Sequence, residues 1–291
     1  MTTLIEAVKS GDSQKVKALL SIGIEYNNVE DDGNTPLYYA CLKGNQSIVE
    51  MLLDAGINVV NTRRLDVTPL YVASSKGCRS LVERLLLTGI NVTMRDNNTP
   101  LHAASNEGHQ EVVKLLLARG AYVDVRNNTL STPLYLTSSY GHLPVVELLL
   151  AAGANINVTN VYDNTPLHVA VREVHKTIIK RLLDAGADIN ATNIEKNTPL
   201  HFATSKGNHI LAKILLDAGA DVNVTNISKN TPLHLAAKSG SKELVKMLLD
   251  ACVDINPLNN ENETPLFMAD WNGHWSVVEL LQDAGGKYGF Y

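Results

Sequence analysis

Nine histidines are the residues of this sequence that could most readily bind a metal or transfer protons. Eight of them form two sets of four, each at a fixed distance after a Thr-Pro-Leu triplet. The first set, directly after the triplet, is His102, His168, His201 and His234, and the second, at the position seven residues further on, is His109, His142, His175 and His274. A helical zinc pair needs a spacing of four residues, and no Cys-x-x-Cys pair accompanies these histidines. We therefore predict hydrogen bonds within and between repeated elements, and we expect no metal and no cofactor.

The three cysteines offer the other possible chemistry. Cys41, Cys78 and Cys252 are odd in number and far apart, which argues against a disulfide framework. Cys41 stands where equivalent segments have Ala or Ser, so we interpret it as a small packing residue, and we expect Cys78 to be partly exposed. The sequence has no G-x-S-x-G, G-x-x-x-x-G-K-[ST] or H-E-x-x-H motif. We interpret the protein as a non-enzyme, and an enzyme with a cryptic Cys/His site is the alternative.

Thr-Pro-Leu triplets mark an internal repeat with a period of 33 residues. The triplets begin at Thr35, Thr68, Thr99, Thr132, Thr165, Thr198, Thr231 and Thr264. All intervals are 33 residues except the one of 31 between Thr68 and Thr99, and a degenerate copy without proline begins at Thr2. The chain therefore contains nine repeats, and no linker or change of composition separates them.

Each repeat carries the signals of two short helices. Thr165 is a typical N-cap, and Pro166 suits the first helical position, where its missing N–H costs nothing. A glycine ends most of the first helices, a second amphipathic segment such as residues 242–251 follows, and another glycine usually ends that segment. Helices of about ten residues do not persist alone in water, so the repeats must stack and bury a shared aliphatic core.

Two helix ends depart from this pattern. Val174 and Cys252 each occupy a position where most other repeats have glycine. A β-branched residue is strained in the left-handed conformation by about 1–2 kcal/mol. The sequence therefore predicts either real strain at Val174 or a shifted helix end.

The repeat resembles the ankyrin repeat, because it combines TPLHxA, a following glycine, VVxLLLxxGA and DVN in 33 residues. The resemblance covers essentially the whole chain, and eight of the nine repeats match it strongly. It implies an all-α fold, an ankyrin-repeat α-solenoid of stacked helix-turn-helix units with hairpin-like loops on one edge. We expect a single domain over residues 1–291. Its repeats span approximately residues 1–30, 31–62, 63–93, 94–126, 127–159, 160–192, 193–225, 226–258 and 259–291.

Composition limits the classes of partner. A net charge of −5 disfavours nucleic acid and anionic membranes. No apolar run approaches the roughly 20 residues of a membrane-spanning helix, and the N-terminus lacks a secretory signal pattern, so we expect a cytoplasmic protein. The 28 asparagines, with frequent Ile and Lys, resemble ankyrin proteins of intracellular bacteria. On that resemblance the chain would be secreted as an effector, and its target would be a host protein.

Positions that vary between repeats are released from stacking, so they are the candidates for partner recognition. One set directly precedes the glycine of the first helix, on the side that is concave in the ankyrin family, and the other lies at the loop tips. Val161, Ile194 and Ile227 share one tip position, which predicts either an apolar stripe or β-branched residues that stiffen the loop. The candidate partner-binding residues are Tyr140, Trp271, Val161, Tyr162, Ile194, Ile227, Lys76, Glu107, Arg172, Lys206 and Lys238.

These features predict a protein–protein interaction module, acting as an adaptor, scaffold or stoichiometric inhibitor through its concave face and hairpin tips. A rigid, preformed surface suits this role because little ordering is needed on association. The alternative is a self-associating structural protein whose aromatic C-terminal tail, residues 288–291, drives assembly. Polar end repeats favour a monomer in the absence of a partner.

Overall fold

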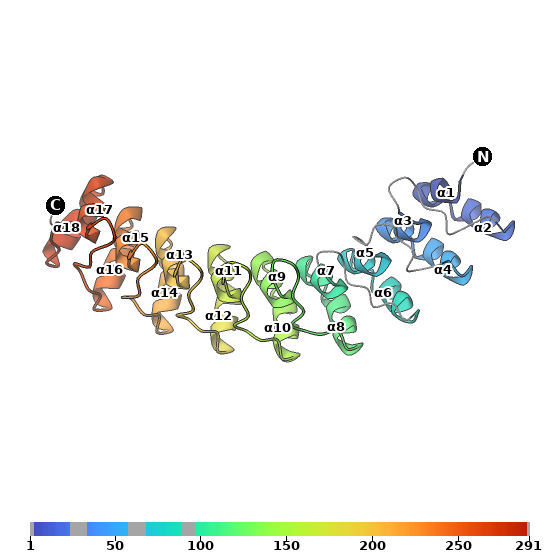
Figure 1. Ribbon diagram of the computed structural model, residues 1–291, viewed down its shortest axis with the longest axis horizontal. Helices are drawn as coiled ribbons and strands as arrows, with labels where there is room; N and C mark the ends of the chain where they lie inside the picture. Colours follow the sequence, from blue (N-terminus) through green and yellow to red (C-terminus); the bar gives the residue numbers. More distant parts are fainter. Residues whose placement is uncertain (1–2, 24–33, 58–67, 89–96, 290–291) are drawn as a thin grey trace. The chain divides into compact units, whose positions relative to one another are not determined.

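A computed structural model describes residues 3–23, 34–57, 68–88 and 97–289 of the chain (Figure 1). These residues form 18 helices and no strand, which confirms the predicted all-α class. The helices occur as a pair in each repeat. The chain divides into two compact units, Met1–Ala154 (unit 1) and Asn155–Tyr291 (unit 2). The expectation of a single domain over the whole chain stays a prediction.

Five helix pairs make up unit 1, and four make up unit 2. The helices of unit 1 are α1 (Leu4–Ser10), α2 (Ser13–Ser21), α3 (Pro36–Lys43), α4 (Gln46–Asp54), α5 (Pro69–Ser75), α6 (Arg79–Leu86), α7 (Pro100–Asn106), α8 (Gln110–Ala118), α9 (Pro133–Tyr140) and α10 (Leu143–Ala151). Those of unit 2 are α11 (Pro166–Arg172), α12 (Lys176–Asp184), α13 (Pro199–Ser205), α14 (His209–Asp217), α15 (Pro232–Ser239), α16 (Lys242–Asp250), α17 (Pro265–Trp271) and α18 (Trp275–Asp283).

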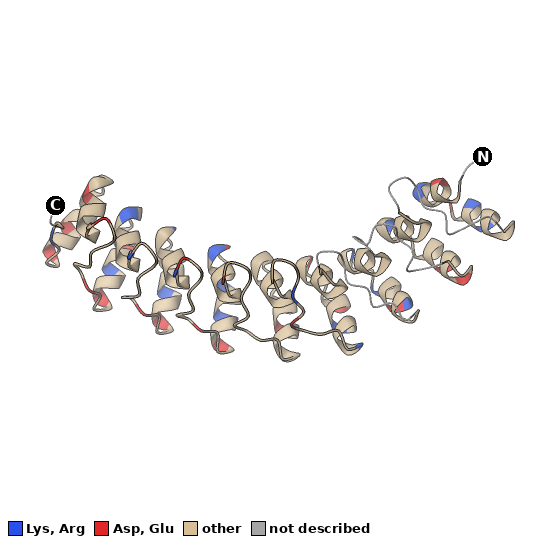
Figure 2. Ribbon diagram, viewed as in Figure 1, with Lys and Arg blue, Asp and Glu red and all other residues tan. Residues whose placement is uncertain are grey.

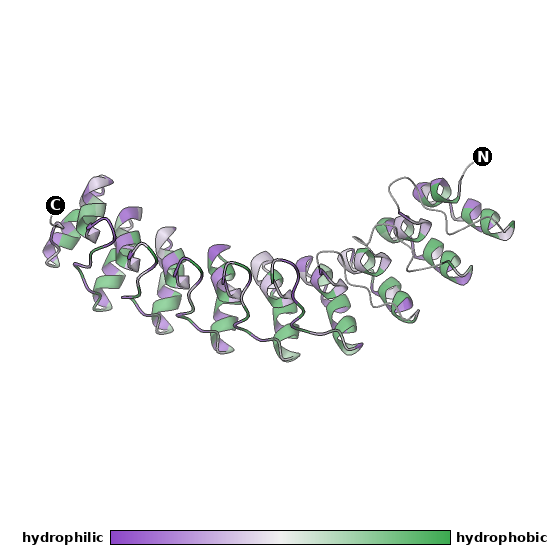
Figure 3. Ribbon diagram, viewed as in Figure 1, coloured by the Kyte–Doolittle hydropathy of each residue, from purple (hydrophilic) through white to green (hydrophobic). Residues whose placement is uncertain are grey.

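Within each unit, the first helix of a repeat packs on the first helix of the next, as α5 does on α7 and α13 does on α15. Second helices stack on one another in the same way, as α16 does on α18. The leucine of every described Thr-Pro-Leu triplet is at most 1% exposed. Hydrophobic residues recur in every helix pair (Figure 3), and this aliphatic core is what the short helices share.

Threonine caps the first helix of every repeat in the described residues. The Thr165 side chain, for example, accepts a hydrogen bond from the backbone N–H of His168, and Pro166 occupies the first helical position. Second helices differ, because Asp12, Asn45, Asn208 and Ser241 cap them with a side chain whereas histidine at the same position does not. The imidazole of a histidine at that position bonds a backbone carbonyl of the preceding repeat instead.

The end of α11 is strained and not shifted. Helix α11 ends at Arg172 and α13 ends at the equivalent Ser205, so the two helices have the same length. Val174 has φ +67°, and the equivalent Gly207 also has φ +67°. Cys252 is left-handed as well, with φ +57°. Of the two alternatives that the sequence left open, the structure therefore shows a β-branched residue held in a conformation that favours glycine.

Serine hydroxyls occupy an unusual place in the core of unit 1. Ser74, Ser105 and Ser138 occupy equivalent positions in α5, α7 and α9, and Cys41 occupies the same position in α3. All four residues are fully buried, and the three hydroxyl groups have no hydrogen-bond partner among the described residues. The prediction that Cys41 is a small packing residue is confirmed.

Asparagines connect the loops of successive repeats. In unit 2 the side-chain amide of Asn226 donates to the Asn197 side chain at 3.0 Å. The side-chain oxygen of Asn226 in turn accepts from the backbone N–H groups of Ser228 and Asn230, both at 3.0 Å. Equivalent bonds join Asn193 to Asn164 and Asn259 to Asn230. These side chains shape each loop and tie it to the preceding one.

A second series of asparagines lies nearer the second helices of unit 2. The backbone N–H of Asp221 donates to the Asn190 side chain at 2.9 Å, and that of Asp254 donates to Asn223 at 2.9 Å. Many of the 28 asparagines thus have a structural role that follows from the repeat itself. The proposed bacterial origin, which rested on their number, gains nothing from the structure.

Candidate partner-binding surfaces

The histidines after the Thr-Pro-Leu triplets link successive repeats. The Nε2 of His168 lies 3.0 Å from the carbonyl oxygen of Asn197, and its Nδ1 accepts from the backbone N–H of Thr165 at 3.2 Å. This pattern fixes a neutral imidazole with the proton on Nε2. Burial lowers the pKa of His168 to about 4, against smaller opposing effects of hydrogen bonds to backbone carbonyls. Burial also lowers the pKa of His201 and His234.

Histidines at the start of the second helices bond back to the preceding repeat. The Nε2 of His109 lies 2.9 Å from the carbonyl oxygen of Ser75, and that of His274 lies 3.0 Å from the carbonyl oxygen of Lys238. The predicted structural role of both histidine sets is therefore confirmed. In the described part of the chain, no group of His, Cys, Asp and Glu is arranged to hold a metal ion.

The environment of Cys41 does not activate its thiol. Cys41 is fully buried, and burial, followed by the proximity of Cys78, raises the pKa of its thiol. Cys78 is half-buried, as expected, and Cys252 is exposed. A raised thiol pKa disfavours the thiolate that a nucleophile needs.

The surface that we call the turn edge of unit 2 comprises the last turn of each first helix, the connecting turn and the first residue of the second helix. It carries four of the predicted site residues, Arg172, Lys206, Lys238 and Trp271. Trp271 is 80% exposed, and its ring stacks on Phe267 with the ring centroids 6.0 Å apart. The Arg172 guanidinium bonds the Glu173 carboxylate at 2.8 Å.

The loop tips of unit 2 carry the other predicted group. Val161, Tyr162, Ile194 and Ile227 are all exposed, by 42 to 61%. Backbone bonds join the tips, since Ile194 N–H donates to the Tyr162 carbonyl at 3.1 Å and Ile227 N–H donates to the Glu195 carbonyl at 2.9 Å. The apolar side chains thus stand on adjacent, mutually bonded loops, and whether they bind a partner stays a prediction.

Three predicted residues, Tyr140, Lys76 and Glu107, belong to unit 1. Tyr140 is 57% exposed, and its ring stacks on that of His142 with centroids 6.4 Å apart. Glu107 accepts from the Asn106 side-chain amide at 2.9 Å, and Lys76 is the C-cap of α5. In the sequence order of the repeats, Lys76, Glu107 and Tyr140 occupy one position in three successive turns.

A family model described as "Ankyrin repeats (3 copies)" matches residues 1–63, 58–127, 134–226 and 200–289. The chain belongs to the ankyrin-repeat family. The ankyrin-repeat α-solenoid predicted from the sequence is confirmed by this match and by the stacked helix pairs of both units. Comparison with curated proteins gave no match.

Ankyrin repeats are protein–protein interaction modules, and they are generally not enzymes. A protein partner is therefore expected for this ankyrin-repeat chain. Among the described residues, no helix is long and apolar enough to cross a membrane.

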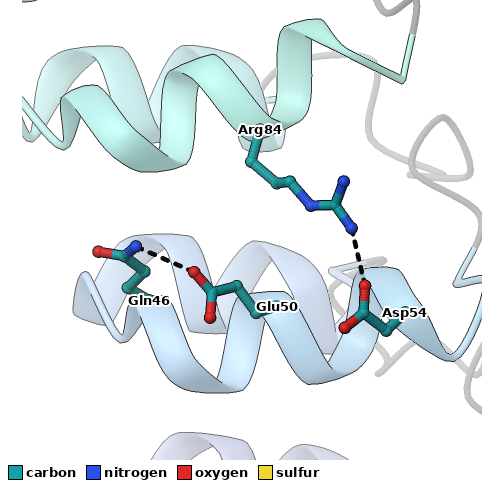
Figure 4. A network of polar contacts seen from close by, with 4 residues as sticks. All are labelled: Gln46, Glu50, Asp54 and Arg84. Carbon is teal, nitrogen blue, oxygen red and sulfur yellow. Dashed lines mark hydrogen bonds and ion pairs between the residues drawn. The ribbon is translucent and has the colours of Figure 1, made fainter.

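Two ion pairs join the second-helix segments of successive repeats in unit 1. Arg84 of α6 bonds Asp54 of α4 at 2.7 Å, and Gln46 bonds Glu50 within α4 at 2.9 Å (Figure 4). Arg119 reaches Glu83 of the preceding repeat at 3.3 Å. These pairs are exposed, so each stabilises the stack by only about 0–1 kcal/mol.

Sequence reasoning missed two strongly exposed aromatic residues, Tyr122 in a loop of unit 1, which is 71% exposed, and Trp275 in unit 2. Trp275, the first residue of α18, is 66% exposed and lies across a three-residue turn from Trp271. The signal was available, because Lys176, His209 and Lys242 occupy the same position in the other repeats of unit 2. Because the three other repeats of unit 2 have a polar residue at this position, the tryptophan is not part of the interface by which repeats stack.

Proposed function

We propose that this ankyrin-repeat protein is a stoichiometric binding protein, an adaptor, scaffold or inhibitor, that recognises a protein partner through its turn edge and its loop tips. The proposal rests on the contrast in exposure between the positions that all repeats share and those that vary between repeats. Residues shared by all repeats, such as the triplet leucines, are buried, whereas Trp271, Tyr140, Tyr162 and Ile227 stand at variable positions and are more than half exposed. Large exposed apolar side chains of this kind are typical anchors of protein interfaces.

The architecture suits recognition by a preformed surface. Hydrogen bonds through His168, Asn226 and their equivalents connect the successive repeats of unit 2. A partner therefore binds side chains whose backbone is already ordered, which reduces the entropic cost of association. We place the protein in the cytoplasm of the cell in which it acts. That this cell is a host, and the protein a bacterial effector, is a further proposal that rests on composition alone.

The test is capture of a partner from a cell lysate, with wild type beside a variant that combines Tyr140→Ala, Tyr162→Ala, Ile194→Asp and Trp271→Ala. All four side chains are exposed, so the variant is expected to fold, and circular dichroism checks this. A matched control changes four exposed residues of the second helices, namely Lys114→Ala, Glu147→Ala, Lys180→Ala and Lys246→Ala.

Truncation of interface anchors costs about 2 kcal/mol or more each, so the first variant should lose a partner that wild type and control both retain. Retention of the same partner by all three proteins would show that the turn edge and the loop tips are not the binding surface. Recovery of only the chain itself, with light scattering showing oligomers, would favour self-association instead.

A further inference from the structure

The turn edge of unit 2 combines positive charge with exposed tryptophan. Lys206, Lys238 and Lys242 are exposed, and Arg172 is half-buried at the same edge. Trp271 and Trp275, the only tryptophans of the chain, lie at the turn of its last repeat and are 80% and 66% exposed. Neither tryptophan is needed for stacking, because the position of Trp271 holds Arg, Ser or Lys and that of Trp275 holds Lys or His in the other repeats of unit 2.

These side chains lie on neighbouring turns, because α11, α13, α15 and α17 pack in that order, and two hydrogen bonds join the turns in pairs. The Lys206 ammonium donates to the backbone carbonyl of Arg172, which ties the end of α13 to the end of α11. The His274 imidazole bonds the carbonyl oxygen of Lys238 at 3.0 Å. Since His274 lies between Trp271 and Trp275 in sequence, this second bond places Lys238 beside the tryptophan turn.

The positive charge of this edge is only partly neutralised. Glu173 pairs with Arg172, Glu243 follows Lys242, and Asp270 precedes Trp271. Lys206 and Lys238 have no carboxylate within ion-pair distance in the described part of the protein.

The ends of the second helices have the opposite charge. The last residue of each second helix in unit 2 is an aspartate, Asp184, Asp217, Asp250 or Asp283 (Figure 2). The charge of unit 2 is therefore polarised, although the chain as a whole carries a net charge of −5.

We propose that the turn edge of unit 2 binds an acidic peptide segment of the partner, with an aromatic or aliphatic side chain of that segment packed on Trp271 and Trp275. This inference rests on the proposed binding function and specifies the chemistry of the partner. Carboxylates would lie along Lys206 and Lys238, where charge complementarity selects the segment and accelerates its association. The exposed indole rings would supply the buried area.

A protein segment fits this surface better than a nucleic acid does. Single-stranded nucleic acids are bound by aromatic rings distributed along a basic groove, so that successive bases stack. Here both tryptophans lie in one turn, and the aspartates at the ends of the second helices would repel a long polyanion. The nucleic-acid alternative is an explicit outcome of the test.

The test begins with affinity selection from a random library of 12-residue peptides on the full-length chain. Enriched peptides should have a net negative charge and should contain Leu, Phe, Tyr or Trp. Selection of neutral or basic peptides, or no enrichment, overturns the inference. Neither result affects the proposed function, which the lysate capture tests separately.

The best peptide is then titrated while tryptophan emission is recorded, because both tryptophans lie in the site. Emission should shift to shorter wavelength as the indoles leave water. Trp271→Ala with Trp275→Ala should weaken binding by about 30-fold, measured for that variant by fluorescence anisotropy of a labelled peptide. Raising the salt concentration from 50 to 500 mM should weaken wild-type binding several-fold.

Charge reversal locates the site. Lys206→Glu with Lys238→Glu should weaken binding at least tenfold. The matched control, Lys180→Glu with Lys246→Glu, makes the same change of net charge at exposed positions of the second helices and should leave affinity within twofold of wild type. Loss of binding in the control variant alone places the peptide on the second helices and overturns the inference. Tighter binding of a 20-nucleotide oligothymidylate than of the peptide also overturns it.

Discussion

The strain at the end of α11 can be measured as a change in the free energy of unfolding when Val174 is replaced. Val174 has φ +67° where the other eight repeats have glycine, and it is 39% exposed. Val174→Gly relieves about 1–2 kcal/mol of left-handed strain. It also adds about 0.4–1 kcal/mol of backbone entropy to the unfolded chain. We expect a net stabilisation of about 1 kcal/mol, measured as a higher urea midpoint at an unchanged m-value.

The following repeat explains why a side chain fits at this position at all. A Cβ added to Gly77, Gly108 or Gly240 would lie 2.5–2.6 Å from the imidazole of His109, His142 or His274, the histidine that begins the next second helix. After Val174 this position is Asn208, whose side chain accepts from the Leu211 N–H at 3.1 Å instead. At Gly207, where Ser241 follows, the nearest atom to an added Cβ is 3.7 Å away.

The structure therefore predicts coupling between Val174 and Asn208. In wild type, Asn208→His loses an N-cap worth about 1 kcal/mol and adds an overpacking cost of about 1–3 kcal/mol. In the Val174→Gly background, only the loss of the cap remains. A double-mutant cycle should give a coupling free energy of at least about 1 kcal/mol. Equal costs of Asn208→His in both backgrounds, or destabilisation by Val174→Gly, would refute the reasoning.

Three further predictions concern polar groups that are buried or half-buried. Asn226→Ala should destabilise the chain by about 2–3 kcal/mol in urea denaturation, because three hydrogen bonds of its side chain are lost; an effect below about 0.5 kcal/mol would contradict its linking role. Lowering the pH from 7 to 4 should remove up to about 3 kcal/mol through His168, since the unfolded imidazole binds a proton near pH 6.5 and the folded one only near pH 4. His168→Gln should flatten this part of the pH profile, and the same change at the exposed His209 should not. Ser105→Ala should stabilise the chain by about 1 kcal/mol, because its fully buried hydroxyl has no partner in the described residues; a large loss of stability would reveal a hidden one.

The repeat made the fold predictable, because each signal recurs many times. Threonine caps, N1 prolines and the spacing of leucines specify the first helices locally, and the helices observed begin at those prolines. The histidine bonds were also predictable in kind, since a polar ring that recurs at a fixed position of several stacked repeats needs a partner. Which carbonyl each ring reaches, as His168 reaches that of Asn197, depends on the geometry of stacking.

The candidate surface was less predictable. Exposure of Trp271 and Ile227 follows from their variable positions, but the sequence does not say that the Asn226 side chain bonds three groups at once. Those bonds depend on the turn of each loop and on the distance to the previous loop. Trp275 begins a second helix, and its departure from the repeat is apparent only when that position is compared between repeats.

The most direct test of the central claim is amide hydrogen exchange of the full-length protein, alone and with a captured partner. Binding through the proposed surfaces should slow exchange at the turns that end α11, α13, α15 and α17 and at the loop tips around residues 161–163, 194–196 and 227–229. Exchange in the middle of the second helices should be unchanged. Protection confined to the second helices, with none at the turns or the tips, would contradict the account.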